Sequence, residues 1–546
     1  MTIPYTPGVV VHEIPAQNKP IEGVATSVVG FVGRTPGGPV NTPIQVTNWT
    51  QFVKTFSDPA DVVRPHGQKR GPYIPGAYLA HAVYGFFQNG GGVCWVVRVE
   101  EYDDSDIPEV RLLPAGSTAG ADVPDVFRAF AKPEVKGDVT IAVAEDPPPD
   151  PAASPATGTA LTVLPTTPVS TQPTITVTVT GPDPFEDETH ANLTVLPGPR
   201  YLPTVLNSAS KMVRVSETGA LIPATPRSVA PVAETKLAKP EQAKLVVNEL
   251  VGDPATRTGV YALEAAHGLT TVCVPDAMSV EDDQGVVGTA ESIQAVQGAV
   301  SSFCEANQAM AIFDAPIDRD TPQEIKEWVA SPQAPPPSKF GTLYWPWIMV
   351  NDPLGGDPVA VPPCGHVAGV WARTDETRGV FKAPANEDLR GALALGYATN
   401  DVEQSDMNQA GINCIRFFPG RGIRIWGART LSVNTDPEWK YLNVRRLFNY
   451  LSASILNGTQ WAVFEPNDET LWVSLQVSVS NFLTTVWRTG ALFGTSPSEA
   501  FFVKCDAETN PPEERDLGKV NIVVGVAPVK PAEFVIFQLS QYQPAG

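Results

Sequence analysis

Five carboxylates close to the ends of expected strands are the residues of this chain best placed to do chemistry. The strands are expected at 271–275 and 310–315. Ligands of open α/β sheets bind beyond the carboxyl ends of the strands, so such carboxylates could hold a divalent metal for hydrolysis or phosphoryl transfer. Acidic caps on loops explain the same residues. An α/β metal-dependent hydrolase with a β-rich accessory domain is one alternative. The carboxylates are Asp276, Glu281, Asp282, Asp283 and Asp314.

The sequence lacks the motifs that accompany known catalytic sites. It contains no nucleophile elbow, no HExxH helix and no P-loop. The six histidines include no pair at i, i+3 or i+4, and the six cysteines form no CxxC pair. We therefore expect a protein that is not an enzyme, with no catalytic residue, no cofactor and no metal.

A second group of chemically active side chains is basic. Residues 411–464 hold seven bases against two acids, in a chain of net charge −21. Ion pairs within one fold would explain these bases, and the alternative is an electropositive face for an acidic partner or for an acidic part of a neighbouring copy. The glycines at 420, 422 and 427 form GxGxxxxG, which is not the dinucleotide fingerprint, so a nucleotide site is excluded. The bases are Arg416, Arg421, Arg424, Arg429, Lys440, Arg445 and Arg446.

Periodicity and caps predict the elements that carry these bases. Apolar and polar residues alternate within 411–426 on both sides of a Pro/Gly turn, which predicts two strands. Asp436 as N-cap, followed by proline, predicts a helix over 437–457. A second helix with a single apolar stripe is expected from Asn467, its predicted N-cap, to Gly490.

Strands and helices alternate elsewhere in the chain, which implies a partly parallel sheet. The fold class is therefore α/β (α+β) and multidomain. Strands are predicted at 27–33, 94–99, 271–275, 310–315 and 341–350, and helices at 76–89, 289–307 and 322–330.

Several ordered motifs resemble those of contractile tail sheath proteins. This family covers phage tails, R-type pyocins and extracellular contractile injection systems. About two thirds of the length takes part in the resemblance, and the gap lies mainly at 101–245. The motifs are PGVVVHEI, FFQNGGGVCWVVRV, VPPCGHVAGVWARTDETRGVFKAPAN, GINCIRFFPGRGIRIWGARTL, WKYLNVRRL, WAVFEPN and GVAPVKPAEFV.

The resemblance implies a structural and mechanical function. Such subunits polymerise helically around an inner tube, and contraction of the sheath drives the tube through a target envelope. The implied partners are many copies of the same chain, the inner tube protein, and baseplate and terminal cap proteins. A static, non-contractile coat filament is a further alternative. The resemblance does not distinguish a phage from a bacteriocin or an injection system.

Both ends of the chain have the composition of extended arms. Each end could tuck into its own domain or complete a sheet of a neighbouring copy by β-augmentation, and the resemblance favours the second. The arm residues are Val9, Val10, Val11 and Ile14, and then Phe534, Val535, Ile536 and Phe537. The family also implies a helix that contacts the tube. The candidates are the face near 440–446 and a segment at 511–517 that contains Glu513, Glu514 and Arg515.

Composition shifts and the resemblance together predict five regions. Residues 101–200 hold sixteen acids and five bases, a balance of −11, and 145–185 contain ten prolines. This stretch is read as part of an inserted, β-rich, outward-facing acidic domain. The regions are an N-terminal arm (1–20), a middle α/β domain (21–100 and 246–350), the insertion (101–245), a C-terminal sheath core that faces the tube (351–519), and a C-terminal arm (520–546).

Charge and hydropathy exclude two kinds of partner. A net charge of −21 is opposite to the basic footprint of a nucleic-acid binder. No apolar run of about 18 residues occurs, and the first residues lack the basic and apolar parts of a signal peptide, so no membrane insertion is expected. Synthesis and assembly are expected in the bacterial cytoplasm, as part of a phage tail or a tail-like particle that could be released.

Overall fold

The computed structural model describes most of the chain outside the two ends and parts of the insertion. Among the predicted arm residues only Phe534 is described, and its side chain is 74% exposed. Val9, Val10, Val11, Ile14, Val535, Ile536 and Phe537 lie outside the described residues. The described residues are 20–57, 71–74, 76–99, 110–112, 127–131, 139–146, 174–180, 187–195, 198–210, 212–217, 232–237, 245–282, 286–353 and 358–534.

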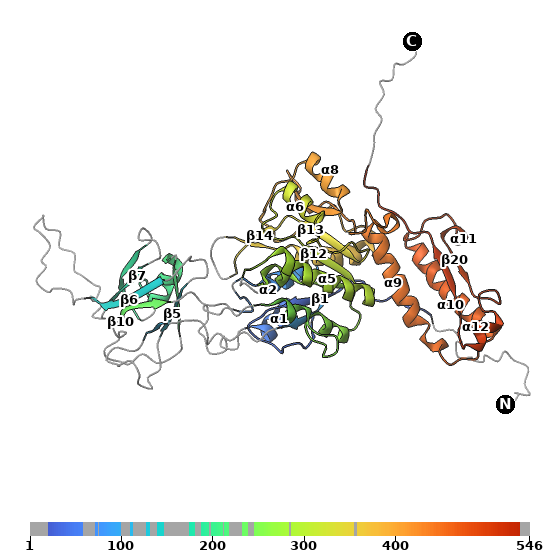
Figure 1. The fold of residues 1–546 in the computed structure, drawn as a ribbon, viewed down its shortest axis with the longest axis horizontal. Helices are drawn as coiled ribbons and strands as arrows, with labels where there is room; N and C mark the ends of the chain where they lie inside the picture. Colours follow the sequence, from blue (N-terminus) through green and yellow to red (C-terminus); the bar gives the residue numbers. More distant parts are fainter. Residues whose placement is uncertain are drawn as a thin grey trace, which may run out of the picture.

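A nine-stranded mixed sheet forms the body of the molecule (Figure 1). Its six central strands, from β18 to β3, are parallel, while β16, β19 and β2 pair antiparallel at the edges. β1, β12 and β13 are buried along their whole length, as expected for parallel strands covered on both faces. In spatial order the strands are β16 (Glu387–Asp388), β19 (Gly422–Ile425), β18 (Ile412–Phe418), β13 (Gly341–Trp345), β12 (Met310–Asp314), β11 (Thr271–Cys273), β1 (Val28–Gly33), β3 (Val93–Arg98) and β2 (Ile44–Val46).

Helices pack on this sheet, and two of them, α2 and α7, lie in unusually close contact. A Cβ at Gly365 would collide with the backbone carbonyl of Ala82, and one at Gly369 with that of Phe86. Only glycine therefore permits this approach. The body contains α1 (Trp49–Phe56), α2 (Leu79–Gln88), α4 (Val247–Val251), α5 (Ala290–Asn307), α6 (Pro322–Val329), α7 (Cys364–Arg378), α8 (Asp401–Gln409), and the 3-10 helices η3 (Gly259–Ala265) and η4 (Pro275–Ser279).

A small antiparallel sheet completes the body. Its strands are β15 (Val359–Val361), β14 (Ile348–Val350) and β17 (Ala394–Leu395). The strand predicted at 341–350 is thus two strands, because the chain breaks at Pro346 and β14 changes partners. Among the described helices, none is both long and apolar enough to cross a membrane.

The insertion is β-rich, as predicted, and lies beside the body in Figure 1. Two antiparallel sheets and one helix share a core that includes Phe127, Ile141, Val177 and Leu206. Along β7 buried and half-buried residues alternate, as expected for a strand that packs one face on a core. The elements are β4 (Val110–Leu112), β5 (Phe127–Ala131), β9 (Val213–Glu217), β10 (Val232–Leu237), β6 (Val139–Glu145), β7 (Ile175–Thr180), β8 (Glu188–Leu193) and α3 (Leu202–Ala209).

A C-terminal lobe, residues 437–529, lies on the opposite side of the body, with α9 next to the body (Figure 1). The predicted division at 350/351 falls inside the nine-stranded sheet, because β13 pairs with β18. The lobe contains η5 (Pro437–Trp439), α9 (Leu442–Gly458), η6 (Gln460–Ala462), α10 (Glu469–Arg488), α11 (Pro497–Ala500), β20 (Phe501–Lys504), α12 (Pro512–Asp516) and β21 (Val523–Val526).

Two predicted helix starts in this lobe are wrong. The helix expected from 437 begins at Leu442, because Leu442 N–H donates to the Ala428 carbonyl at 3.1 Å and holds this stretch against the body. The second helix is capped by Asp468, whose Oδ1 accepts from Leu471 N–H at 3.0 Å. Asn467 instead accepts a hydrogen bond from Trp472 Nε1 at 2.9 Å.

Candidate interface for assembly

The C-terminal lobe contains a sheet of only two strands. β20 and β21 pair antiparallel from Phe501↔Val526 to Lys504↔Val523, and in the described chain no third strand joins them. One face packs on the core beneath α9 and α10. On the other face Phe502 is 58% exposed. A two-stranded sheet is marginally stable and its outer edges present unpaired backbone groups, so these edges can accept further strands.

A single side chain contact partly covers the β20 edge. Gln476 Nε2, from α10, donates to the carbonyl of Val503 at 3.0 Å. After β21 the chain runs beside residues 491–493, which precede β20 in the sequence. Phe493 N–H donates to the Ala527 carbonyl at 2.8 Å. The β21 edge along 523–526 has no such partner within the described residues, which makes it the more open of the two edges.

The two ends of the described chain are held at opposite ends of α9. Ile21 packs so closely on Gly458 that a Cβ there would meet it at 2.7 Å, and Val24 N–H donates to Ser454 Oγ at 3.2 Å. Glu533 lies at the other end, next to Lys440. Since α9 has 17 residues, about 25 Å of helix separate the two anchor points.

Arg429 fixes the C-terminal anchor through a bidentate ion pair. Its Nε and Nη2 lie 2.8 and 2.6 Å from the two carboxylate oxygens of Glu533, and Lys440 Nζ lies 3.7 Å from the second oxygen. Burial alone would raise the pKa of Glu533, but hydrogen bonds and charge from Arg429 outweigh it and hold this pKa below its usual value. The carboxylate is therefore ionised at neutral pH.

Arg446 connects the lobe, the body and the N-terminal segment. Its Nη1 and Nη2 lie 2.9 and 2.5 Å from the Asp375 carboxylate on α7, and the two side chains are 3% and 2% exposed. The guanidinium lies over the Trp371 ring, 4.7 Å from its centroid. Burial raises the pKa of Asp375, and the charge of Arg446 offsets part of this. The pair is therefore a buried clasp between α9 and α7.

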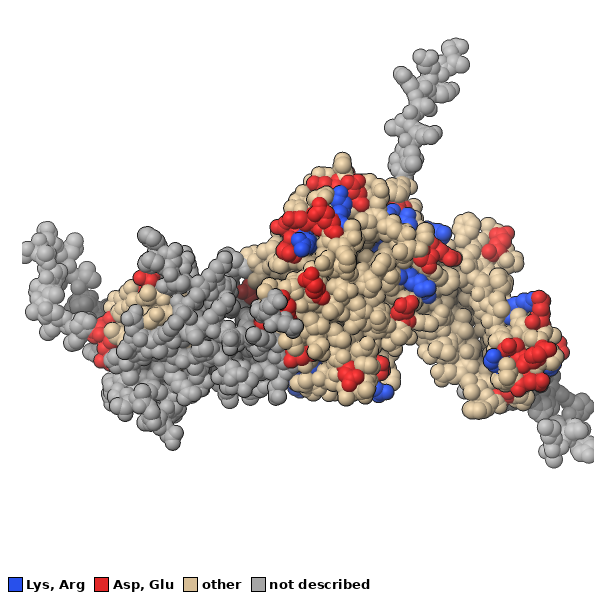
Figure 2. Space-filling model, in the orientation of Figure 1, with Lys and Arg blue, Asp and Glu red and all other residues tan. Residues whose placement is uncertain are grey.

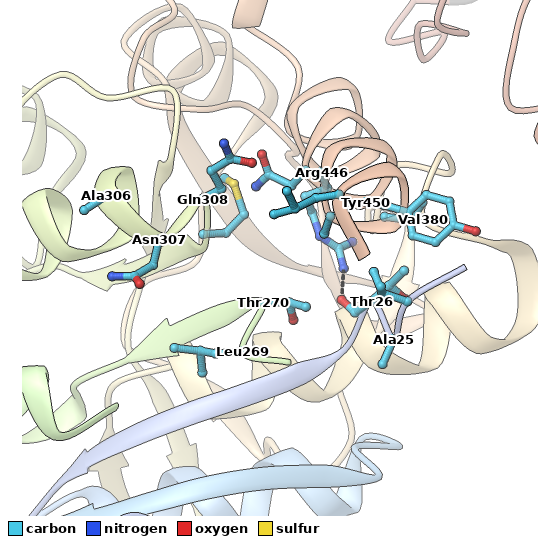
Figure 3. A pocket seen from close by; sticks show the side chains of 15 residues that line it. Ala25, Thr26, Leu269, Thr270, Ala306, Asn307, Gln308, Val380, Arg446 and Tyr450 are labelled. Atoms are coloured by element: carbon cyan, nitrogen blue, oxygen red, sulfur yellow. Dashed lines mark hydrogen bonds between the residues drawn. The ribbon is translucent and has the colours of Figure 1, made fainter. Parts of the chain in front are cut away.

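A cavity of about 290 Å³ lies at this junction (Figure 3). Arg446 points across it, and its Nη2 donates to the Thr26 carbonyl at 3.4 Å. Thr270 and Gln308 line it from the body, and Tyr450 from α9. The chain leading from the N-terminal segment into β1 therefore passes between the lobe and the body.

Two further predicted bases are used inside the fold. Arg416 Nη1 lies 2.7 Å from the Asp401 carboxylate and 2.6 Å from Gln404 Oε1. Arg445 stacks over the Trp439 ring at 4.2 Å, and burial lowers its pKa to about 10. With Arg446, Arg429 and Lys440, five of the seven bases are thus held by an ion pair or, for Arg445, by burial against aromatic rings.

The remaining predicted residues are more exposed. Arg421 and Arg424 donate to Asn386 at 2.5 and 2.8 Å, and neither has an ion pair in the described chain. On α12, Glu514 pairs with Lys519 at 3.4 Å, while Glu513 is exposed. Arg515 lies over the Trp472 ring at 5.9 Å. Roles for these residues in contacts with a neighbouring copy or a tube remain predictions.

Three of the five carboxylates that suggested an enzyme, Asp276, Asp282 and Asp314, accept hydrogen bonds from backbone N–H groups. Asp276 accepts from the backbone N–H of Arg34, Tyr78 and Leu79 at 2.6, 2.5 and 3.1 Å, where α2 begins. Asp314 accepts from Cys364 N–H at 2.9 Å, where α7 begins.

The described residues around these carboxylates do not form a metal site. Asp282 accepts from Val286 N–H at 2.8 Å, and Asp283 is outside the described residues. Within the described ranges, no three His, Cys, Asp or Glu side chains gather as a metal site would require. The structure therefore gives no support to the hydrolase alternative.

Sequence reasoning missed both acids that anchor this region. Asp375 lies within the motif WARTDETRG, and Glu533 lies directly before the predicted arm residue Phe534. The only signal was the local excess of bases in 411–464, which implied that acids elsewhere in the chain could balance them.

The described chain thus has an α/β body and a two-stranded sheet with an open edge, and its first and last described segments are held at opposite ends of α9. Comparisons with known proteins agree with the predicted family. Residues 276–431 match the phage tail sheath protein central domain, and residues 434–541 match the phage tail sheath C-terminal domain. Both matched models are phage tail sheath domains and together cover most of the C-terminal half of this chain, which confirms its resemblance to contractile tail sheath proteins.

Individual relatives agree with this resemblance. The tail sheath protein of Burkholderia phage BcepMu is 24% identical over 96% of this chain and 94% of its own length. The tail sheath protein of Vibrio phage KVP40 is 28% identical over 32% of this chain. The match spans about a quarter of that relative, 26% of its length.

Solved structures share the fold. The contracted helical sheath of the anti-feeding prophage has a TM-score of 0.56 and 21% identity, with 99% of this chain and 100% of that chain covered. The contracted sheath complex of the extracellular contractile injection system PVC has a TM-score of 0.55 and 21% identity, with 99% of each chain covered. These likenesses confirm the predicted mixed α/β class.

Proposed function

We propose that this protein is the structural subunit of a contractile sheath, and that it performs no catalysis and binds no cofactor. Copies polymerise helically around an inner tube, and contraction drives the tube through a target envelope. The match to the sheath domains supports this function, and the two-stranded sheet β20–β21 is the observation that carries its mechanism. The relatives are named as phage tail sheath proteins.

The terminal arms complete the β20–β21 sheets of neighbouring copies. The C-terminal arm was predicted from residue 520, but β21 belongs to the subunit's own sheet and Glu533 is anchored by Arg429, so the part of this arm that links copies follows Glu533. Main-chain hydrogen bonds along an open edge supply affinity that depends little on side chains, as in other strand-addition complexes. The edge of β21 is the more open, and one face of the sheet is already packed on the lobe core. A strand added by a neighbouring copy would therefore pair with a strand that is already folded and packed.

A force carried along linked arms passes through α9 in each subunit. The N-terminal segment is held near Gly458, and Glu533 is held near Lys440. The buried Arg446–Asp375 clasp connects α9 to the body. We therefore propose that subunits move as rigid bodies during contraction, from a metastable extended lattice to one of lower free energy.

The predicted arrangement of domains fits this function. Residues 101–245 would face outward, and residues 351–519 would face the tube. The other partners would be the tube protein, the baseplate and the terminal cap. Assembly would take place in the bacterial cytoplasm, and the particle would be a phage tail or a tail-like injection device.

Electron microscopy of the intact protein and of truncated variants tests the proposal. Deletion of 1–19 or of 535–546 removes the arms and keeps Ile21 and Glu533, which are anchored within the subunit. We expect tubes from the intact chain and dispersed subunits from both variants. Two tube diameters would distinguish a contractile sheath from a static coat. Tubes that survive both deletions would contradict linkage through the arms.

A further inference from the structure

The turn between β18 and β19 projects a basic and aromatic surface, which we call the basic hairpin (residues 417–424). Phe417 is 59% exposed at its base. The Arg421 guanidinium lies 5.6 Å from the Phe418 ring centroid and 5.7 Å from that of Trp426, and these contacts hold it in position. Arg421 and Arg424 have no acidic partner in the described chain. Their two positive charges are therefore available to a partner.

Two acids on β16, the strand that pairs with β19, already have ion pairs. Glu387 on β16 is bound by Lys382 Nζ at 2.7 Å. Asp388 is shared by Arg373 at 3.4 Å and Arg390 at 3.2 Å. Because each acid has a base of its own, neither neutralises Arg421 or Arg424, and the surface stays positive.

At the end of the C-terminal lobe that is farthest from the body, a loop exposes the apolar side chain of Phe464. Phe464 is fully exposed and its φ is +69°, a left-handed conformation that is uncommon for a bulky residue. Leu517, on the neighbouring segment, is 67% exposed. Asn467 Nδ2 donates to the Lys519 carbonyl at 2.8 Å and connects the two segments. The loop thus holds the Phe464 side chain in solvent, where a second protein surface could cover it.

Acidic residues surround Phe464, and we call the whole surface the acidic tip (residues 463–469 and 506–519). These two segments contain eight acids and two bases. Figure 2 shows the acidic side chains gathered at this end of the lobe, over α12. Four of the acids are exposed and have no basic partner in the described chain, namely Glu465, Glu469, Glu513 and Asp516.

We infer that the acidic tip of one copy docks on the basic hairpin of a second copy. The charges are complementary, and each surface carries an exposed phenylalanine. Arg421 and Arg424 of the hairpin and four acids of the tip have no ion pair within the described residues. Because the two surfaces differ, the contact is heterologous, and a heterologous contact that does not close into a ring generates an open helix. This inference rests on the proposed function. It identifies a contact between subunits in addition to the contacts made by their arms.

Charge reversal in the full-length protein tests the pairing. One variant reverses the basic hairpin (Arg421→Glu/Arg424→Glu), and another reverses the acidic tip (Glu513→Lys/Asp516→Lys). A third variant combines all four substitutions. The control, Glu264→Lys/Asp318→Lys, makes the same change in net charge as the tip variant at acids outside both surfaces. Light scattering gives the critical concentration for tube formation, and electron microscopy identifies the tubes.

We expect each reversal alone to raise the critical concentration by about tenfold or more, since like charges then face each other. The combined variant should return to within about threefold of the wild type, because the pairing is restored with opposite sign. The control should assemble like the wild type. Phe464→Ser should weaken assembly without lowering the melting temperature, because the side chain packs on nothing in the free subunit.

Several outcomes would overturn the inference. Normal assembly of either single reversal would do so, and so would failure of the combined variant when the control assembles. If reversal of the hairpin lowers the melting temperature, Arg421→Gln/Arg424→Gln replaces it and should still raise the critical concentration. A wild-type protein that forms no tubes would instead refute the proposed function, so the two failures can be told apart.

Discussion

Replacement of Arg446 by methionine tests the clasp between α9 and the body. Methionine keeps much of the apolar stem that packs near Trp371 but leaves the Asp375 carboxylate, 2% exposed, without its partner. Removal of one member of a buried pair costs about 3–5 kcal/mol, because an uncompensated charge stays buried. The local opening free energy of α9 should fall by this amount. Amides within 442–458 would then exchange roughly two to four orders of magnitude faster.

Native-state hydrogen exchange measures this effect locally, so the result does not depend on two-state unfolding of the whole chain. The double variant Arg446→Met/Asp375→Leu should recover to within about 1 kcal/mol of the wild type, because neither charge remains. Lys326→Met breaks an exposed pair with Asp406 and should change exchange by less than about 1 kcal/mol. Unchanged exchange in Arg446→Met, or a double variant as unstable as the single one, would refute the reasoning.

Three further predictions concern other parts of the fold. Glu533→Gln should weaken the C-terminal anchor by about 1–3 kcal/mol and speed amide exchange in 527–533. In the wild type this anchor is present above the usual pKa of a glutamate and is lost as pH falls through the lowered pKa of Glu533. Burial raises the pKa of Asp314 to about 7, so the stability of the body should fall by up to about 4 kcal/mol as pH rises from 4 to 7, and Asp314→Asn should remove this slope in denaturant titrations. Gly365→Ala should lower the melting temperature because its Cβ would meet α2, whereas Gly92→Ala, with nothing within 4 Å, should not.

Each of these predictions has a contradicting result. Exchange in 527–533 that does not change in Glu533→Gln would show that Arg429 does not hold the chain end. An equal pH slope in Asp314→Asn and the wild type would assign the slope to other groups. Equal melting temperatures for the Gly365 and Gly92 variants would show that α2 and α7 separate easily.

Local signals predicted much of the body from the sequence. The apolar run predicted at 310–315 and the first half of the run predicted at 341–350 form the buried parallel strands β12 and β13. Thr321, directly before the predicted helix 322–330, caps α6 through a capping box with Glu324. These predictions succeed because the deciding interactions lie within a few residues along the chain.

Tertiary contacts decided the features that were missed. Asp436 and Pro437 begin only the short 3-10 helix η5, and pairing of Arg429 with Tyr441 keeps the chain extended before α9 begins. The acids Asp375 and Glu533 lie 71 and 104 residues from the arginines that bind them. No local pattern identifies such partners, so the sequence indicated the basic residues and left their ionic partners open.

A cryo-electron microscopy map of tubes assembled from the full-length protein tests the central claim most directly. We predict that the sheet β20–β21 gains strands from the terminal arms of neighbouring copies, with continuous density leading from Ile21 and Glu533 into other subunits. A sheet that stays two-stranded, or that is completed by the ends of its own chain, would contradict the claim that sheath subunits are linked through their arms.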